Sequence, residues 1–91
     1  MAKRISIFGK QKCGKCTATK NKVEHFLTKM GMADDVQAVF FDMDSEEGLV
    51  EGAFRDVFEV PTTIVDDGNE DVARWAAMIP DSTELQNALR A

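Results

Sequence analysis

The chain has 91 residues, 44% of them hydrophobic, a net charge of −5 and only two cysteines. This length and composition predict a single domain over residues 1–91, with a hydrophobic core that needs no disulfide scaffold. The sequence contains no run of about 18 apolar residues, and the apolar segment behind Lys3 and Arg4 is too short for a signal peptide. We therefore expect a cytoplasmic protein that is not bound to a membrane, and cysteines in that compartment are reduced by default.

The charges divide sharply along the chain. Residues 1–30 contain eight Lys or Arg and one Glu, a charge of +7, whereas residues 31–91 contain three Arg and 15 acids, a charge of −12; together these give −5. The acidic second part repels phosphate, so we expect no nucleic-acid partner. The basic first part would steer acidic partners toward itself, although a solvated helix face without that role explains the same lysines.

The first two strands and the helix between them follow from hydrophobic periodicity. Residues 5–8 predict a short strand that Gly9 closes. A helix is then predicted from Gly14 to residue 30, ended by Gly31. Residues 37–41 are mostly apolar, which predicts a second, buried strand. The stripe of the helix that faces the sheet is expected to contain Cys16, Val23, Phe26, Leu27 and Met30.

A second helix is predicted after residue 44. Asp44 and Glu47 have the spacing of a capping box, which marks a helix N-terminus. Gly48 and Gly52 lie inside this helix and weaken it by up to about 1 kcal/mol each relative to alanine. Its buried face is expected to consist of Leu49, Val50, Ala53, Phe54 and Val57.

The last third of the chain predicts a hairpin and a helix. Residues 62–65 are β-branched and predict a third strand, residues 67–69 predict a turn, and residues 70–75 predict the fourth strand. Asp81 and Glu84 have the spacing of a cap pair and open a last helix, with Leu85, Ala88 and Leu89 facing inward. The order β-α-β-α-β-β-α predicts an α/β fold, a four-stranded mixed sheet with helices on both faces.

Cys13 and Cys16 are separated by two residues where the first strand leads into the first helix. If Gly14 opens that helix, Cys13 caps its N-terminus, where free N–H groups and the helix dipole stabilise a thiolate. Cys16 lies one turn later on nearly the same face, within reach of a disulfide. We therefore predict a thiol–disulfide oxidoreductase with Cys13 as the nucleophile and Cys16 as the resolving thiol.

Three neighbours are expected to tune the reactivity of Cys13. Gly14 has no side chain to block the approach to the sulfur. The ammonium groups of Lys12 and Lys15 flank Cys13 and are expected to lower the pKa of its thiol.

The same cysteine spacing also occurs in metal sites. Zinc needs two further ligands, and the chain offers no other cysteine and one histidine, His25 in the first helix. The alternative function is therefore a dimeric module in which two chains hold zinc or an iron–sulfur cluster through Cys13 and Cys16. In the redox interpretation we expect a monomer with no bound metal or cofactor.

The whole chain resembles the glutaredoxin branch of the thioredoxin superfamily. The residues that carry the resemblance are Cys13-Gly14-Lys15-Cys16 at the first helix and Val60-Pro61-Thr62 at the third strand. It implies a thioredoxin-like fold, a cis peptide bond before Pro61 facing the dithiol, and pairing of the Val60 backbone with the extended chain of a disulfide-containing protein substrate. Lys10 matches the glutaredoxin lysine that holds a substrate carboxylate.

The resemblance also bears on the reductant. Glutaredoxins bind the γ-glutamyl end of glutathione with a Gly-Gly and an Asp after the fourth strand, and this chain lacks them. Trp75 and Pro80 have the spacing found in glutaredoxin-like redoxins that donate electrons to ribonucleotide reductase and are recharged by thioredoxin reductase, although Trp75 equally suits a core position. The resemblance implies an electron carrier with a redox-active Cys13–Cys16 disulfide, reduced by thioredoxin reductase with NADPH or by glutathione.

Overall fold

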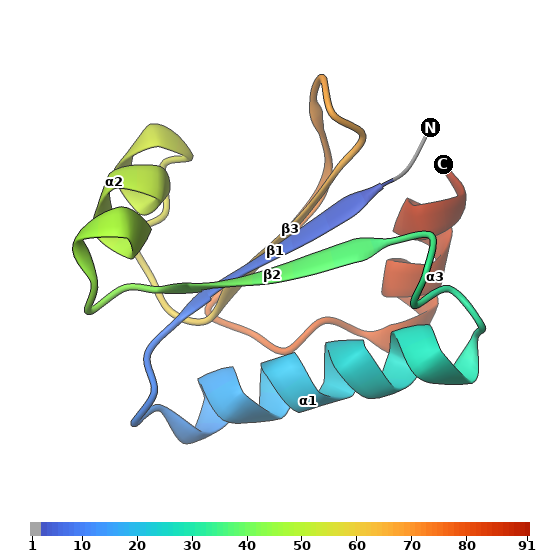
Figure 1. The fold of residues 1–91 in the computed structure, drawn as a ribbon, viewed down its shortest axis with the longest axis horizontal. Coiled ribbons are helices and arrows are strands. Elements are labelled where there is room, and N and C mark those ends of the chain that lie inside the picture. The colour runs from blue at the N-terminus through green and yellow to red at the C-terminus, as the bar shows by residue number, and fades with distance from the viewer. Residues whose placement is uncertain (1–2) are drawn as a thin grey trace.

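The computed structural model describes residues 3–91 and contains one four-stranded sheet and three helices (Figure 1). In chain order the elements are β1 (Arg4–Gly9), α1 (Gly14–Lys29), β2 (Gln37–Asp42), α2 (Glu46–Phe54), β3 (Thr62–Asp66), β4 (Asp71–Ala76) and α3 (Ser82–Arg90). The strands lie in the order β2-β1-β3-β4, with β1 and β2 parallel and the other pairs antiparallel. The predicted element order and mixed sheet are confirmed, with α1 and α3 on one face and α2 on the other.

The main core lies between the sheet and the pair of helices α1 and α3. Ile5 and Ile7 of β1 point to this face, whereas the next residue, Phe8, points to the other, as the alternation of a strand requires. Burial of one such aliphatic side chain contributes about 1.5–3 kcal/mol. The predicted inward residues of α3 are buried, and so are all those of α1 except the half-buried Phe26 and the exposed Met30: Cys16, Val23, Leu27, Leu85, Ala88 and Leu89.

The turn between β3 and β4 is built as the sequence predicts. Gly68 has a φ of 96°, a left-handed conformation that glycine adopts without a steric penalty. The carboxylate of Asp67 accepts hydrogen bonds from the backbone N–H groups of Asn69 and Glu70, both at 2.9 Å. These bonds, the one from Glu70 first, hold the pKa of Asp67 below its ordinary value.

The N-terminus of α2 differs from the prediction. Its cap is Ser45, whose Oγ accepts a hydrogen bond from the N–H of Gly48 at 3.0 Å, so the expectation that Asp44 caps this helix was wrong. The Ser45 hydroxyl also donates to the carbonyl oxygen of Asp42 at 2.6 Å. Ser45 therefore ties the start of α2 to the last residue of β2.

The buried face of α2 was also predicted wrongly. Gly48 and Gly52 face the sheet, and a Cβ atom built on Gly48 would lie 1.8 Å from the carbonyl oxygen of Asp42. The helix packs so closely that only glycine fits at that point. Four of the five residues expected to be buried are exposed on the opposite side: Leu49, Val50, Ala53 and Phe54. Only Val57, beyond the helix, is buried, in a small cluster with Phe8 and Ile64.

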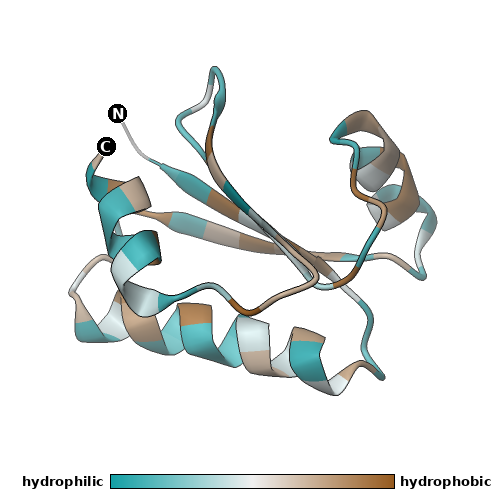
Figure 2. Ribbon diagram, turned by 180° about the vertical axis from the view of Figure 1, so that it is seen from behind, coloured by the Kyte–Doolittle hydropathy of each residue, from teal (hydrophilic) through white to brown (hydrophobic). Residues whose placement is uncertain are grey.

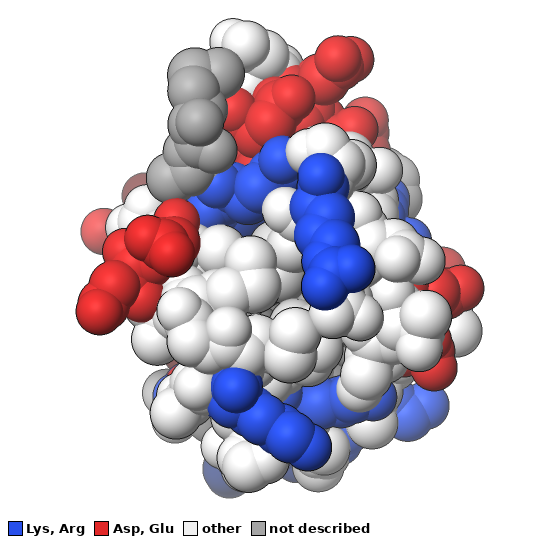
Figure 3. Space-filling view, turned by 90° about the vertical axis from the view of Figure 1, so that its right-hand side faces the viewer, with Lys and Arg blue, Asp and Glu red and all other residues white. Residues whose placement is uncertain are grey.

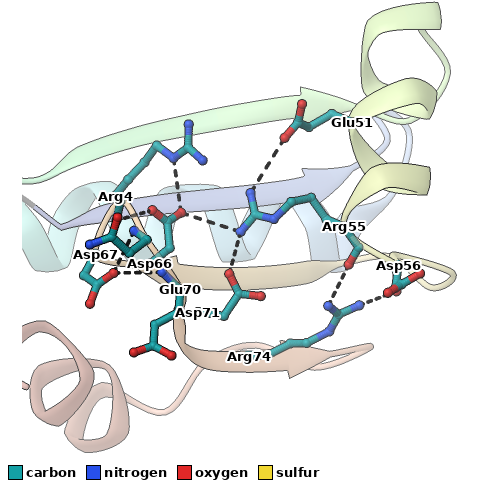
Figure 4. Close-up of polar contacts among 11 residues, drawn as sticks. Arg4, Glu51, Arg55, Asp56, Asp66, Asp67, Glu70, Asp71 and Arg74 are labelled. Carbon is teal, nitrogen blue, oxygen red and sulfur yellow. Dashed lines mark hydrogen bonds and ion pairs between the residues drawn. The ribbon is translucent and has the colours of Figure 1, made fainter.

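Charged residues fasten the C-terminal end of α2 to the sheet (Figure 4). The Arg55 guanidinium donates to Asp71 at 3.1 Å and lies 3.5 Å from Asp66, which also pairs with Arg4 at 3.2 Å. The side chains of Arg55 and Asp66 are only 13% and 8% exposed, so this pair is shielded from solvent screening. Arg74 donates to the backbone carbonyl of Arg55 at 2.8 Å. Polar contacts thus hold a helix end where the sequence pattern predicted apolar packing.

We predict that Gly48→Ala lowers the free energy of unfolding by about 1–3 kcal/mol, because the new methyl group overlaps the backbone of β2. Gly52→Ala is the matched control in the same helix. There the new Cβ overlaps the flexible end of the Met43 side chain, at 2.7 Å, and meets the Cβ of Val57 at an ordinary contact distance of 3.7 Å. Alanine also favours the helix by up to about 1 kcal/mol. Urea denaturation of both variants measures the difference. Equal losses would contradict the close approach at Gly48.

Candidate active site

Cys13 is the N-cap residue of α1. Its backbone is extended, with φ of −96° and ψ of 114°, and the helix begins at Gly14. The Sγ atom of Cys13 accepts a hydrogen bond from the backbone N–H of Cys16 at 3.1 Å. The first turn of the helix therefore directs an N–H group and the positive end of its dipole at this sulfur.

The two cysteines are joined in a disulfide with their Cα atoms 5.2 Å apart. Cys16 is completely buried, whereas Cys13 is partly exposed. A molecule approaching from solvent therefore meets the sulfur of Cys13 first. This asymmetry is what the helical spacing of the two residues predicts.

Gly9 lies directly against the disulfide, a role that the sequence analysis missed. A Cβ atom on Gly9 would come within 2.8 Å of the Cβ and 2.9 Å of the Sγ of Cys16. The last residue of β1 must therefore lack a side chain if Cys16 is to pack against the end of the sheet. The signal for this contact in the sequence is a glycine at the end of the strand that leads into the cysteine pair. The sequence analysis used that glycine only to mark the end of the strand.

The segment Val60-Pro61-Thr62 lies at the same end of the sheet. The Val60–Pro61 peptide bond is cis, as the resemblance implied, and Pro61 is buried. Thr62 pairs with Phe8, the residue before Gly9, so β3 begins beside the end of β1 that carries the disulfide. The Pro61 carbonyl accepts a hydrogen bond at 2.8 Å from Ala77, whose φ of 59° is a left-handed conformation that favours glycine. This bond ties the segment after β4 to the proline.

Lysines surround the start of α1. Lys12 and Lys15 are exposed on either side of Cys13. Lys10 lies 3.8 Å from the carboxylate of Asp44, so an acid of the chain itself already accompanies the residue expected to hold a substrate carboxylate. Lys20 lies 5.5 Å from the ring centroid of Phe40. A hollow of about 260 Å³ is lined here by Lys10, Gln11, Thr17, Lys20, Asn21 and Phe40.

Basic and acidic side chains share the side of the molecule opposite the start of α1. Figure 3 shows basic side chains along the bottom, where α1 lies, and in the upper middle, with acidic side chains at the top and on both sides. The concentration of positive charge near Cys13 comes from its own segment, in which Lys10, Lys12 and Lys15 are exposed.

Trp75 belongs to the core. It is 6% exposed, and its Nε1–H donates to the carboxylate of Glu84 at 3.0 Å. Asp81 caps α3 as predicted, because its carboxylate accepts from the backbone N–H groups of Thr83 at 3.0 Å and Glu84 at 3.1 Å. The carboxylate of Glu84 therefore accepts the hydrogen bond of Trp75, while the backbone N–H of Glu84 is the group that Asp81 caps.

Among residues 3–91, no three His, Cys, Asp or Glu side chains are grouped so as to hold a metal ion, and His25 is exposed on α1. None of the helices in the described part of the chain has both the length and the apolar character needed to cross a membrane.

We predict that Gly9→Ala destabilises the oxidised protein by about 1–3 kcal/mol, because its methyl group forces Cys16 away from the sheet. Gly14→Ala is the matched control, since a Cβ atom there has no neighbour within 4 Å. Thermal and denaturant unfolding of the oxidised variants tests this. Unchanged stability of Gly9→Ala would show that Cys16 does not depend on the bare backbone of β1.

No protein-family model and no curated protein matches the sequence. The structure is similar to a malaria-parasite thioredoxin-2, with 19% identity, a TM-score of 0.79, and coverage of 98% of this chain and 82% of that one. It is also similar to thioredoxin O2 from Arabidopsis thaliana, with 19% identity, a TM-score of 0.77, and coverage of 98% of this chain and 73% of that one. For thioredoxin 1 from Thermosipho africanus the identity is 24%, the TM-score is 0.70, and the coverage is 96% of this chain and 90% of that one. The sheet order, the placement of the helices and these similarities together show that the chain has the thioredoxin fold.

Proposed function

We propose that this chain is a thiol–disulfide oxidoreductase that reduces disulfides of protein substrates through Cys13 and Cys16. The observation that carries the proposal is the asymmetric cysteine pair, in which a partly exposed sulfur at a helix N-terminus is bonded to a fully buried one. The thioredoxin fold supports the proposal, because the pair lies at the end of the sheet where Pro61 directly precedes β3.

The first step of the proposed reaction uses Cys13. In the reduced protein its thiolate attacks one sulfur of the substrate disulfide. The substrate S–S bond breaks, a bond forms between Cys13 and that sulfur, and the other substrate sulfur leaves as a thiolate that takes a proton from solvent. The Cys16 N–H group and the positive end of the α1 dipole stabilise the Cys13 thiolate before the attack.

The second step uses Cys16. Its thiol loses a proton and attacks the Cys13 sulfur, which breaks the mixed disulfide and releases the second substrate sulfur as a thiol. Two electrons have then passed to the substrate, and the Cys13–Cys16 disulfide remains, which is the state of this structure. The residue six positions before Cys13 is Ile7, which is buried and apolar. That position therefore offers no carboxylate to take the proton of Cys16.

The substrate chain is proposed to lie along Val60. This residue is half-buried, precedes Pro61 and leads into β3 at the end of the sheet that carries the disulfide. Its backbone N–H and C=O groups would pair with an extended substrate segment, in the manner of a short added strand. Lys12 and Lys15 would attract acidic residues of the substrate.

We propose a reductase of the thioredoxin reductase type, with NADPH, as the source of electrons in preference to glutathione. The γ-glutamyl carboxylate of glutathione would need free N–H groups at the start of α3. There the carboxylate of Asp81 already accepts from Thr83 and Glu84. At the other end of glutathione, Lys10 is accompanied by Asp44. Both anchoring points are thus partly occupied by acids of the chain, which supports a protein reductant that needs neither of them.

The roles of the cysteines predict an order of alkylation. After reduction, iodoacetamide at neutral pH is expected to modify Cys13 well before Cys16, because only Cys13 is reached by solvent. Cys16→Ser is expected to accumulate a mixed disulfide with a substrate protein, whereas Cys13→Ser, its matched control, forms none. Peptide mass spectrometry of both reactions reads out the result. Equal alkylation of the two thiols would refute the assignment.

The choice of reductant predicts a difference in rate. Loss of one charge-assisted anchor costs about 1.5–3 kcal/mol, which would weaken glutathione recognition by about 10- to 150-fold. We therefore expect faster reduction of the Cys13–Cys16 disulfide by thioredoxin reductase with NADPH than by millimolar glutathione. Stopped-flow measurements of both reductants on the same oxidised protein decide this. A clear advantage for glutathione would contradict the proposal and point to a working site at Lys10 and α3.

A further inference from the structure

The outer face of α2 and the segment after it expose large apolar side chains. Phe54 and Phe58 are 84% and 85% exposed, and Leu49 and Val50 are more than half exposed. Among the described residues outside this region, the exposed large apolar side chains are Met30 and Met78. Figure 2 shows the hydrophobic colour on the turns of α2 and on the chain that follows it. We call Leu49, Val50, Phe54 and Phe58 the α2 surface.

The packing of α2 against the sheet does not depend on the apolar side chains of the α2 surface. The α2 helix is held to the sheet by its glycine face, by the Ser45 cap and by the ion pairs of Arg55, and none of these contacts uses a side chain of the α2 surface. Polar residues at Leu49, Val50 and Phe54 would leave those contacts intact. A group of exposed apolar side chains that packing does not require is typical of an interaction site.

The rim of the α2 surface is acidic. Five acids lie in and around the helix: Glu46, Glu47, Glu51, Asp56 and Glu59. The single basic residue of this stretch, Arg55, pairs with Asp66 and Asp71 of the sheet and also lies 3.8 Å from the carboxylate of Glu51, so the other four acids have no basic neighbour within the stretch. Beside the helix lies an open hollow of about 740 Å³, whose lining combines the apolar Phe41 and Val50 with three of the glutamates. The surface is thus apolar in the middle and negative at its edge.

We propose that the α2 surface docks a basic amphipathic segment of a partner protein, in which apolar anchors alternate with lysines or arginines. Apolar anchors would cover Phe54 and Val50, and the cations would face the surrounding carboxylates, which gives electrostatic complementarity. A helix with anchors at positions i, i+3, i+4 and i+7 has the matching pattern.

Two other occupants fit the surface less well. A second copy packed α2 against α2 would bring the two acidic rims together, and like charges across an interface cost affinity. The basic half of a second copy, residues 3–30, offers lysines but exposes only one large apolar side chain, Met30. An anionic membrane surface would be repelled by the acidic rim.

The position of the α2 surface relates it to the disulfide. The α2 helix and the N-terminus of α1 lie at the same end of the sheet, on opposite faces (Figure 1). Phe58 stands two residues before Val60, at which the substrate chain is proposed to bind. A partner seated on α2 would therefore extend toward Cys13. This link to catalysis rests on the proposed function, whereas the docking of a basic amphipathic segment does not.

The test uses a synthetic 14-residue amphipathic helix of leucine and lysine as the probe, and the same helix with glutamate for lysine as its control. Isothermal titration calorimetry is performed with the 91-residue protein and three variants. We expect the double variant Val50→Ser, Phe54→Ser to weaken binding of the leucine–lysine helix by about tenfold or more. Glu46→Gln, Glu47→Gln should weaken it less and reduce its salt dependence. Met30→Ser, the matched control, should change it less than about twofold.

Three results would overturn the inference. The first is equal binding of the leucine–glutamate helix, and the second is binding that Val50→Ser, Phe54→Ser leaves unchanged. The third is dimerisation of the free protein, measured by sedimentation, that the same double variant abolishes, since a second copy would then be the occupant.

Two further measurements keep the inference separate from the proposed function and from misfolding. Circular dichroism checks that the variants fold. Reduction of a small-molecule disulfide by all variants should equal that by the unmodified protein, because none of the changed residues touches the cysteines. If the unmodified protein fails to reduce disulfides yet binds the leucine–lysine helix through α2, the proposed function fails and the docking surface stands.

Discussion

The hydrogen bond from the Cys16 N–H to the Cys13 sulfur determines how the site of this protein is arranged. It caps α1, so the helix begins at Gly14 with its positive end at the reactive sulfur. It also sets which cysteine is exposed, because the residue one turn further along must face the sheet. Gly9 then provides the bare backbone against which Cys16 is packed. The chemistry proposed for the pair depends on this single turn of helix.

Much of the fold could be predicted from the sequence because its local patterns agree with the tertiary structure. The apolar residues of α3 and most of those of α1 recur at helical spacing and are buried, as at Val23 and Leu85. The β-branched run at β3 and the turn at Gly68 predict a hairpin, and the observed strand ends lie within one residue of those predicted. The cysteine site was predictable for the same reason, since its geometry needs only the junction of β1 with α1.

The predictions that failed concern residues whose placement depends on contacts between segments that are distant in the sequence. The hydrophobic pattern of α2 predicts Leu49 and Phe54 inside, but the helix turns its glycines inward. That orientation follows from the approach of Gly48 to the end of β2 and from the pairing of Arg55 with Asp66. Neither contact leaves a periodic signal in the sequence. The role of Gly9 was missed likewise, because it depends on the position of Cys16 across the junction.

The two faces of the sheet therefore differ in how they are completed. On the face of α1 and α3, most apolar side chains pack into one buried core. On the other face, α2 is held by glycines and ion pairs and leaves its apolar side outward. Cys13, for which we propose the redox chemistry, lies at the end of the sheet where these two faces meet.

The central claim is that the Cys13–Cys16 pair passes electrons to protein disulfides. The most direct measurement is the reduction of insulin by dithiothreitol, followed by the turbidity of the released chains, with catalytic amounts of this protein. The account predicts a faster onset of turbidity than with dithiothreitol alone, and no acceleration with Cys13→Ser. An onset with the unmodified protein equal to that of dithiothreitol alone would contradict it.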